Sequence, residues 1–389
     1  MINRKINLAL TSQESAFLWG PRQTGKSTLL KMRFPGARRY DLLLSSEYRR
    51  LMNNPGLLRE ECLAAGLTHK NQVHPIILDE VQKVPELMDE VHWIIENIGL
   101  RFILCGSSAR KLKRKQSGLL GGRAVRYELF PLVYPEIKDF SLVKALNSGL
   151  MPRHYLNETP TRLIQSYVGD YLKEEIAAEA LTRNIPAFSR FMEVAALSNG
   201  EIINFVNIAS ECGVSAPTVK GYYQILEDTL IGRFLPASRK RAKRRLIRAP
   251  KFYFFDIGVV AHLTRRGVVS QGSELFGRVF EHFVYLEILA HSSYSELFYP
   301  LTYWRTASQI EVDFILGDHE IAVEVKSTTQ AKGHHLKNLR AFKDEHPSSR
   351  CILVTMDTRP RRTEDGIDVL PWRDFLEQLW GGKISIGGI

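Results

Sequence analysis

The run Gly20-Pro21-Arg22-Gln23-Thr24-Gly25-Lys26-Ser27 has the residue types and spacing of a phosphate-binding loop, G-x-x-x-x-G-K-[ST]. Glycines let a backbone wrap round a phosphate, so that successive N–H groups and the start of the next helix face its negative charge. Lys26 is expected to reach the β- and γ-phosphates of a nucleotide, and Ser27 to supply a hydroxyl ligand to Mg²⁺. Apolar residues at 16–19 predict a strand before the loop, and residues 27–33 predict a helix after it. The pattern therefore predicts ATP binding and hydrolysis.

Two acidic residues complete this predicted site. The apolar run at 76–78 predicts a buried strand, and Asp79 and Glu80 follow it directly. Asp79 is expected to hold Mg²⁺ through water, and Glu80 to polarise the attacking water. An Asp-Glu pair after an apolar run is common at helix N-termini, so the prediction depends on its combination with the loop upstream. Mg²⁺ is assigned to Ser27 and Asp79, and the nucleotide to Gly20, Pro21, Arg22, Gln23, Thr24, Gly25, Lys26, Ser27, Thr28 and Asp79.

A third apolar run, 102–105, predicts the next strand, and Gly106-Ser107-Ser108 follows it. A polar side chain at the tip of a strand beside the Asp-Glu strand can orient the attacking water. Either serine suits this role, and Ser107 is taken as the candidate. The combined pattern resembles the AAA+ class of P-loop ATPases.

Further motifs extend the resemblance over most of the chain. They are 79–85 (DEVQKVP), 106–109 (GSSA), 121–123 (GGR), 129–132 (LFPL) and 250–258 (PKFYFFDIG). Together they resemble a bacterial and archaeal AAA family that fuses the ATPase to a C-terminal domain of unassigned function. The AAA+ resemblance implies an arginine supplied by a neighbouring subunit, with Arg123 as first candidate and Arg110 as second. The alternative is that either arginine contributes only to a basic surface or a salt bridge. Action in trans by Arg123 would make the active form a homo-oligomer, either a ring or a dimer.

The composition favours a soluble protein that contacts a polyanion. The 389 residues carry a net charge of +11, with basic clusters at 110–115 and 239–245. Nucleic acid is the simplest partner for such an excess, and a solvated basic surface is the alternative. No apolar stretch approaches the roughly 18 residues of a membrane span, and the N-terminus lacks the apolar segment of a secretory signal. The four scattered cysteines lack zinc-ligand spacing. We therefore expect a cytoplasmic protein with no membrane partner.

Three domains are expected. Residues 1–150 should form a doubly wound α/β ATPase domain, 151–238 a helical and winged-helix domain, and 239–389 a second α/β domain. Residues 208–223 have helix-turn-helix spacing, with Gly213 in the turn and Ser215 as the cap of the second helix. Thr218, Lys220 and Tyr222 would face a DNA groove, and 226–234 would form the wing. The alternative is a subunit-packing module.

The last part of the chain carries a second set of chemically competent residues. Asp313 lies on an alternating strand, and Glu324 and Lys326 share one face of the next strand because side chains alternate. A hairpin through 317–319 would bring Asp313 beside them. Two carboxylates and an ammonium then predict a site for Mg²⁺, or Mn²⁺, at which Lys326 orients the nucleophile or lowers its pKa.

This pattern resembles the PD-(D/E)xK nuclease superfamily, which includes restriction endonucleases and Holliday-junction resolvases. Glu281, on the predicted helix 276–290, matches the extra helical carboxylate of part of that superfamily. The resemblance implies a restriction-endonuclease-like fold that cleaves DNA with a metal at Asp313, Glu324 and Glu281. The alternatives are a surface salt bridge of Glu324 with Lys326, or a nuclease fold that binds DNA without cutting it. For the whole chain, the expected function is an ATP-driven nuclease. The alternatives are an ATP-switched DNA- or protein-binding regulator and an ATP-driven remodeller of proteins.

Overall fold

The computed structural model describes residues 2–108, 120–172, 184–238, 248–384 and 386, and its contacts divide the chain into two compact units. The N-terminal unit consists of Ile6–Pro131 with Asp228–Ile231. The C-terminal unit consists of Met1–Lys5, Leu132–Glu227 and Gly232–Ile389. The basic clusters at 110–115 and 239–245, and with them Arg110, lie outside the described residues.

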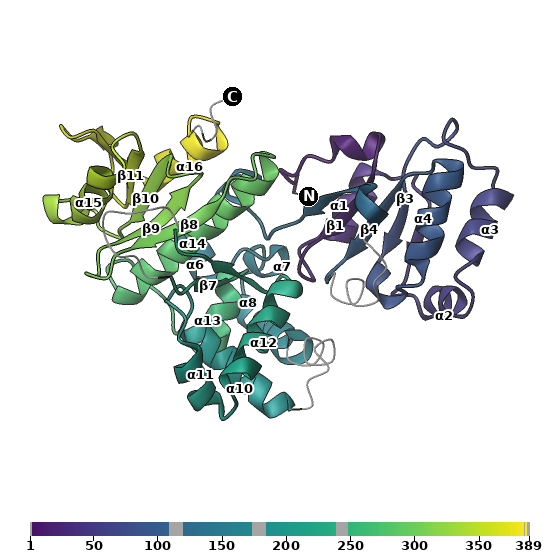
Figure 1. Ribbon diagram of the computed structural model, residues 1–389, viewed down its shortest axis with the longest axis horizontal. Coiled ribbons are helices and arrows are strands. Elements are labelled where there is room, and N and C mark those ends of the chain that lie inside the picture. The colour runs from purple at the N-terminus through teal and green to yellow at the C-terminus, as the bar shows by residue number, and fades with distance from the viewer. Residues whose placement is uncertain (1, 109–119, 173–183, 239–247, 385, 387–389) are drawn as a thin grey trace. The chain divides into compact units, whose positions relative to one another are not determined.

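The N-terminal unit is built on a parallel sheet with the strand order β2-β3-β4-β1-β5 (Figure 1). The apolar runs predicted as buried strands are strands, and every residue of β1, β3 and β4 is buried. The strands are β1 (Ser15–Trp19), β2 (Arg39–Asp41), β3 (Ile76–Asp79), β4 (Phe102–Gly106) and β5 (Ala124–Glu128). The helices are η1 (Ala9–Ser12), α1 (Lys26–Arg33), α2 (Ser45–Asn53), α3 (Leu57–Ala64), η2 (Val81–Lys83), α4 (Leu87–Ile98) and η3 (Leu120–Gly122).

The register of this sheet brings the predicted site residues to one edge. Trp19 at the end of β1 pairs with Gly106, and Asp79 at the end of β3 pairs with Cys105. The strand β4 therefore lies between β1 and β3, and all three end at the same level. One face of the sheet packs against α2, α3 and α4 in a single apolar cluster, which fixes the strands that position the site.

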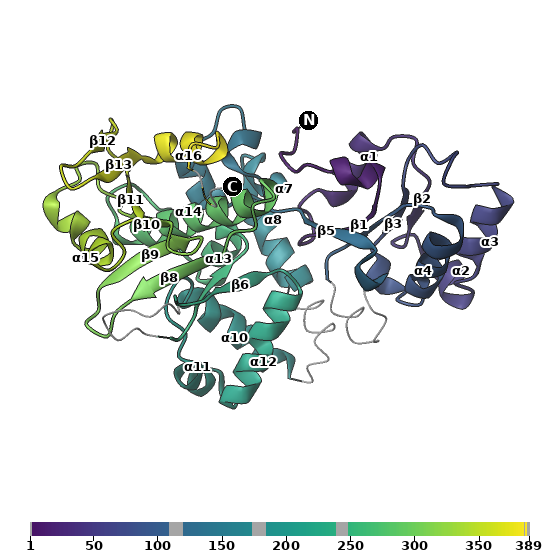
Figure 2. The same cartoon turned by 45° about the horizontal axis from the view of Figure 1, so that its top comes forward.

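The C-terminal unit contains a mixed six-stranded sheet with the order β12-β13-β11-β10-β9-β8. The helices α14 and α16 pack on one of its faces and α15 on the other (Figure 2). The strands are β8 (Leu301–Arg305), β9 (Glu311–Leu316), β10 (Ile321–Val325), β11 (Arg350–Thr355), β12 (Arg361–Arg362) and β13 (Ile367–Pro371). The helices are α14 (Glu274–Tyr294), η6 (Gly333–Leu336), α15 (Lys337–Glu345) and α16 (Trp372–Trp380).

The remaining elements of this unit are mostly helical. They are η4 (Tyr134–Glu136), α6 (Leu142–Ser148), α7 (Pro152–Tyr155), α8 (Pro160–Ser166), η5 (Tyr167–Leu172), α10 (Ile185–Leu197), α11 (Phe205–Cys212), α12 (Ala216–Asp228), β6 (Gly232–Leu235), β7 (Lys251–Phe254) and α13 (Ile257–Leu263). Side chains of α6, among them Leu142 and Leu146, belong to the same apolar cluster as Phe283 and Phe375. Because of this shared core, the division by contacts falls after Pro131 and not near the expected boundary at 150. The three-domain division stays a prediction.

The predicted helix-turn-helix spacing corresponds to α11 and α12. Gly213 ends α11 in the left-handed conformation, with φ of 66°, and Ser215 Oγ accepts a hydrogen bond from the Thr218 backbone N–H at 3.3 Å. Two details of the prediction are wrong. Tyr222 is buried, because its ring packs between Phe188 and Phe191, and it cannot face a groove.

The predicted wing at 226–234 is the second wrong detail. The helix α12 continues to Asp228, and only the end of that range enters β6. The strand β6 pairs in antiparallel fashion with β7 (Lys251–Phe254), which lies well downstream in the sequence. A two-stranded ribbon thus follows the two helices, but its partner strand was assigned to the C-terminal domain.

Candidate functional site

The loop between β1 and α1 has the conformation of a phosphate cradle. Gln23 and Gly25 are left-handed, with φ of 64° and 95°, and α1 begins directly after Gly25. Such left-handed residues turn successive backbone N–H groups toward one point. The buried ammonium of Lys26 donates to the carbonyl oxygens of Gly20 at 2.6 Å and Pro21 at 3.0 Å. The positive charge of Lys26 is therefore held over the loop, where the phosphates of a nucleotide would lie.

Ser27 and Asp79 meet across the sheet. Ser27 Oγ donates to Asp79 Oδ2 at 2.6 Å, although the residues are far apart in sequence. The other carboxylate oxygen, Asp79 Oδ1, is buried and has no hydrogen-bond partner among the described residues. A buried carboxylate oxygen without a partner is costly unless a cation or water binds it. A hydroxyl and a carboxylate side by side are oxygen ligands of the kind that Mg²⁺ prefers, so these residues fit the predicted metal.

Glu80 lies immediately beyond the strand end, with a left-handed φ of 59° that is uncommon for a residue with a side chain. Its Oε2 accepts from Gln82 Nε2 at 2.5 Å and lies 3.4 Å from Ser107 Oγ. Of the two candidate serines, Ser107 is thus the one whose hydroxyl is in contact with the Glu80 network. Ser108 is also buried and makes contacts of its own. The catalytic roles of Glu80 and Ser107 stay predictions.

Arg123 forms an ion pair with Glu96 of α4. Both side chains are about four-tenths exposed, at 41% and 44%. An exposed ion pair of this kind stabilises the fold by at most about 1 kcal/mol, so Arg123 can leave Glu96 for another partner at little cost in free energy. The action of Arg123 on a neighbouring subunit stays a prediction.

In the C-terminal unit the β9–β10 hairpin brings the predicted acids together. The two strands pair in antiparallel fashion with Val323 opposite Phe314, and the Val325 backbone N–H donates to Asp313 Oδ2 at 2.8 Å. Glu324 Oε1 accepts from Lys326 Nζ at 2.7 Å. The two carboxylates are almost fully buried, whereas the Lys326 side chain is 36% exposed. The expected convergence of these three residues is therefore present.

Burial raises the pKa of Asp313 well above its ordinary value, and the nearby charges of Glu324 and Glu281 raise it further. Burial also raises the pKa of Glu324, against the lowering effect of Lys326. Burial disfavours the charge of Lys326, but Asp313 and Glu324 outweigh it and raise the Lys326 pKa. The second oxygen of Glu324, Oε2, is buried with no hydrogen-bond partner among the described residues. The surroundings therefore disfavour the ionised forms of both Asp313 and Glu324 unless a further cation is bound.

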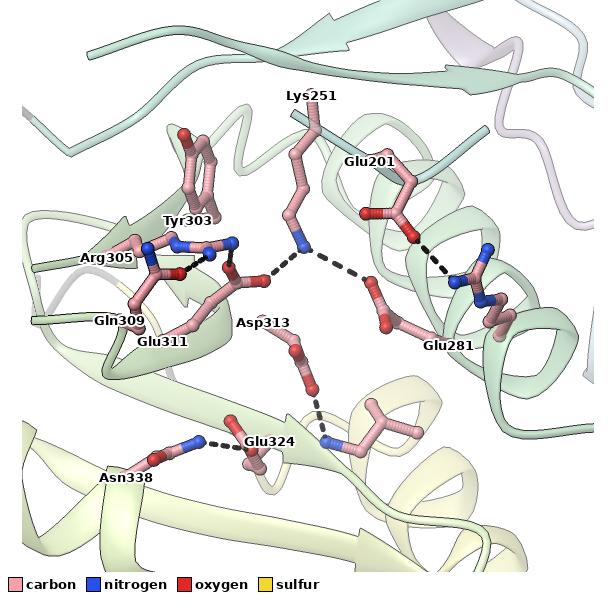
Figure 3. A network of polar contacts seen from close by, with 12 residues as sticks. Glu201, Lys251, Glu281, Tyr303, Arg305, Gln309, Glu311, Asp313, Glu324 and Asn338 are labelled. Carbon is pink, nitrogen blue, oxygen red and sulfur yellow. Dashed lines mark hydrogen bonds and ion pairs between the residues drawn. The ribbon is translucent and has the colours of Figure 1, made fainter. Parts of the chain in front are cut away.

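Figure 3 shows residues of this site that the sequence analysis did not select. Lys251 of β7 is 4% exposed and forms ion pairs with Glu311 at 2.5 Å and with Glu281 at 3.5 Å. Glu281 Oε1 also accepts from the Tyr253 hydroxyl at 2.5 Å. Asn338 of α15 donates to Glu324 at 3.0 Å (Figure 3). Lys251 and Tyr253 belong to the motif at 250–258, and that motif is the one sequence signal that points to them.

The contacts of Glu281 bear on the predicted metal set of Asp313, Glu324 and Glu281. Glu281 is engaged by Lys251 and Tyr253. Over the described ranges, no group of three or more His, Cys, Asp or Glu side chains is arranged to hold a metal ion. Asp313 and Glu324 thus offer two carboxylates and an unpartnered oxygen to a cation, and Glu281 would have to leave Lys251 to join them.

His282, next to Glu281 on α14, anchors that helix to β7. Its Nε2 lies 2.7 Å from the carbonyl oxygen of Phe254, and its Nδ1 lies 3.3 Å from the side-chain nitrogen of Asn199. A carbonyl oxygen only accepts, so we assign the ring hydrogen to Nε2 and neutral imidazole to the folded state. Complete burial lowers the pKa of His282 from 6.5 to about 4.

This pKa predicts a pH-dependent stability. Between pH 6.5 and about 4 the unfolded chain binds a proton at His282 that the folded chain does not, so stability falls as pH falls through this window. The contribution amounts to about 3 kcal/mol. In urea unfolding from pH 7.5 to pH 4, His282→Gln should show a shallower pH dependence than wild type. Replacement of the exposed His334 by Gln is the control, and an equally steep dependence in His282→Gln would contradict the assignment.

The fold and site of the N-terminal unit define its class. A parallel sheet whose strand β1 leads into the lysine-containing loop, with Asp79 and Glu80 at the end of β3, is a P-loop nucleotide-binding domain. Residues 12–138 match the family described as an AAA domain. The N-terminal unit is therefore an ATPase domain of the AAA type, which binds and hydrolyses ATP.

The other comparisons assign no function to the rest of the chain. Residues 139–269 and 276–375 match two domains of unknown function, DUF8612 and DUF4143. Uncharacterized proteins of Mycobacterium tuberculosis and Mycobacterium bovis are each 25% identical over 339 residues, which is 84% of this chain and 73% of theirs. A Walker-type ATPase of Pyrococcus abyssi is 14% identical with a TM-score of 0.41, and the match covers 64% of this chain and 90% of that one. Among the described helices, none has the length and apolar character to cross a membrane.

Proposed function

We propose that this AAA-type ATPase acts on DNA, and that Asp313, Glu324 and Lys326 form a metal-dependent site that hydrolyses phosphodiester bonds. The observation that supports the proposal is the pair of buried carboxylates on β9 and β10, beside Lys326, which directly follows β10 and pairs with Glu324. Buried acids with an unpartnered oxygen, at Glu324 Oε2, are expected where a cation binds. ATP turnover would position or move the DNA relative to this site.

Each residue of the site has a chemical part in the proposal. Asp313 and Glu324 would hold Mg²⁺ or Mn²⁺, and Asn338 would keep Glu324 oriented through its hydrogen bond. The metal would supply an activated water and stabilise charge on the phosphate. Lys326 is the most exposed of the three and would orient the nucleophile. The net charge of +11, together with Lys220 on α12, supports a polyanionic partner.

The ATPase site contributes to the same proposal. Lys26 would bind the β- and γ-phosphates, Ser27 and Asp79 would hold Mg²⁺, and Glu80 would accept the proton of the attacking water. Arg123 would complete the site of a neighbouring copy, so that the active form is a homo-oligomer. The exchangeable surface pair of Arg123 with Glu96 is compatible with that role.

A second function is supported by the contacts of Glu281. Because Lys251 and Arg305 already pair with Glu281 and Glu311, and no three-ligand group is found over the described ranges, the site is also compatible with DNA binding without cleavage. The chain would then be an ATP-switched regulator that assembles on DNA or on a protein partner.

Cleavage and metal binding together separate the two functions. Purified protein is incubated with ATP, Mg²⁺ or Mn²⁺, and plasmid or branched DNA, and Mn²⁺ binding is followed by electron paramagnetic resonance. Asp313→Asn and Lys326→Met should each lower cleavage at least about 10²-fold with ATP hydrolysis retained. Asp313→Asn should also weaken Mn²⁺ binding to the C-terminal unit. Asp365→Asn, an exposed acid of the same unit, is the control. DNA binding by wild type without cleavage or Mn²⁺ binding would establish the regulator instead.

A further inference from the structure

The side chain of Gln82 lies between the two predicted catalytic groups of the ATPase site. Its Nε2 is 2.5 Å from Glu80 Oε2 and 3.1 Å from Ser107 Oγ. Gln82 is 3% exposed and belongs to η2, the short helix that begins one residue after Glu80. One amide nitrogen thus connects the acid at the end of β3 with the hydroxyl at the end of β4.

The chemistry of the partners determines the direction of these hydrogen bonds. An ionised carboxylate only accepts, so the amide group that faces Glu80 must be the NH₂ and not the oxygen. The same NH₂ has a second hydrogen, which points to Ser107 Oγ. Ser107 then accepts from Gln82, and its own hydrogen is left for another acceptor. In the structure this hydrogen is donated to Glu80 Oε2 over 3.4 Å. A hydrogen bond of this length is weak, so a phosphate oxygen or a water can take the hydrogen in its place.

Gln82 makes these contacts at a cost. Its own oxygen, Oε1, is buried and has no hydrogen-bond partner among the described residues. An unpartnered buried amide oxygen lowers stability, so a purely structural role would be better served by an apolar side chain. The neighbourhood is also shaped to fit this side chain. A Cβ on Gly106 would lie 2.3 Å from Gln82 Oε1 and 2.8 Å from Trp19 Cζ3, so a larger residue at the end of β4 would displace Gln82 or Trp19.

We infer that Gln82 is a positioning residue for ATP hydrolysis. It holds the carboxylate of Glu80 in place and makes Ser107 a donor toward the reacting groups. This inference rests on the proposed role of Glu80 as the base that accepts the proton of the attacking water. Gln82 acts through its contacts with Glu80 and Ser107. Its loss should therefore reduce the rate of the chemical step and leave nucleotide binding intact.

Two substitutions of similar size test the inference. Gln82→Met removes both donated hydrogen bonds, and Gln82→Glu replaces the donor by a second carboxylate that repels Glu80. Each should lower kcat for ATP hydrolysis by about 10²-fold, with KM and the Kd of a fluorescent ATP analogue unchanged. If Gln82 and Ser107 act together, Gln82→Met should lower kcat by a smaller factor in the Ser107→Ala protein than in the wild-type protein.

A second buried glutamine of the same unit is the matched control. Gln72 is 8% exposed and forms two hydrogen bonds of 2.8 Å with the backbone of Arg101. These residues precede β3 and β4, so they lie at the ends of the strands away from Glu80 and Ser107. Gln72→Met should lower the thermal midpoint of unfolding and leave kcat unchanged.

Glu80→Gln separates failure of this inference from failure of the base assignment. Normal kcat in Gln82→Met, with Glu80→Gln inactive, would overturn the inference and leave Glu80 as the base. Normal kcat in Glu80→Gln would overturn both. A parallel rise of KM and Kd in Gln82→Met would also overturn the inference, because Gln82 would then shape nucleotide binding.

Discussion

Lys26→Ala is expected to lower kcat/KM for ATP hydrolysis at least about 10²-fold, with the fold retained. Lys26 is 5% exposed, and its ammonium is held by two carbonyl oxygens of its own loop. The loop thus keeps a positive charge close to where the phosphate oxygens would lie, and alanine leaves nothing in its place. Phosphate release under saturating Mg²⁺ and ATP measures the loss.

Lys31→Ala provides the control for this substitution. Lys31 lies on the same helix, α1, but in its last turn and exposed. Its removal lowers the positive charge of the helix equally and leaves the loop unchanged, so turnover should stay close to that of wild type. Full turnover in Lys26→Ala would mean that the loop between β1 and α1 does not bind the phosphates of ATP.

Lys251→Met is expected to destabilise the C-terminal unit by about 3–5 kcal/mol. Although burial disfavours the charge of Lys251, Glu281 and Glu311 raise its pKa, so it is charged in the folded state. Without it, two partly buried carboxylates lose their shared cation, and removal of one partner of a buried pair costs more than the pair contributes. Urea unfolding followed by tryptophan fluorescence measures the change in midpoint.

An exposed ion pair of the same unit gives the comparison. Arg340 pairs with Asp365, and their side chains are 46% and 40% exposed. Arg340→Met should therefore cost at most about 1 kcal/mol. Adding Glu281→Gln to Lys251→Met should restore part of the lost stability, because without Lys251 the carboxylate of Glu281 keeps a hydroxyl partner, Tyr253, but no cation among the described residues. Glu311, in contrast, still pairs with Arg305 at 2.7 Å. An equally small cost for Lys251→Met would mean that Glu281 and Glu311 do not depend on Lys251.

The N-terminal half of the molecule was predictable because its signals are local. A lysine-containing glycine loop, a strand ending in Asp-Glu and a strand ending in serine are each readable from a few consecutive residues. Parallel strands meet at their carboxyl ends, so the meeting of Ser27 with Asp79 follows from the motifs. Gln82 was visible in the same motif, but its contact with Ser107 depends on the side-by-side placement of β3 and β4.

In the C-terminal half, local patterns predicted the β9–β10 hairpin but not the contacts between distant segments. The hairpin of β9 and β10 follows from alternation and a short turn, and it brought Asp313 and Glu324 together as expected. The contact of Lys251 with Glu311 and Glu281 joins three elements that are distant in sequence. The burial of Tyr222 and the pairing of β6 with β7 were missed for the same reason, since the partners lie on other helices or strands.

By itself the sequence determines the phosphate-binding loop, the acids Asp79 and Glu80 that follow the next buried strand, and the spacing of Asp313 and Glu324. These depend on residue type and on short-range backbone geometry, which the neighbouring residues in the chain specify. The tertiary structure alone decides which charges are neutralised, which polar atoms are left without partners and where the core joins the middle and last parts of the chain. Burial and long-range contacts set these properties, because the energy of a charge depends on everything that surrounds it in the folded state.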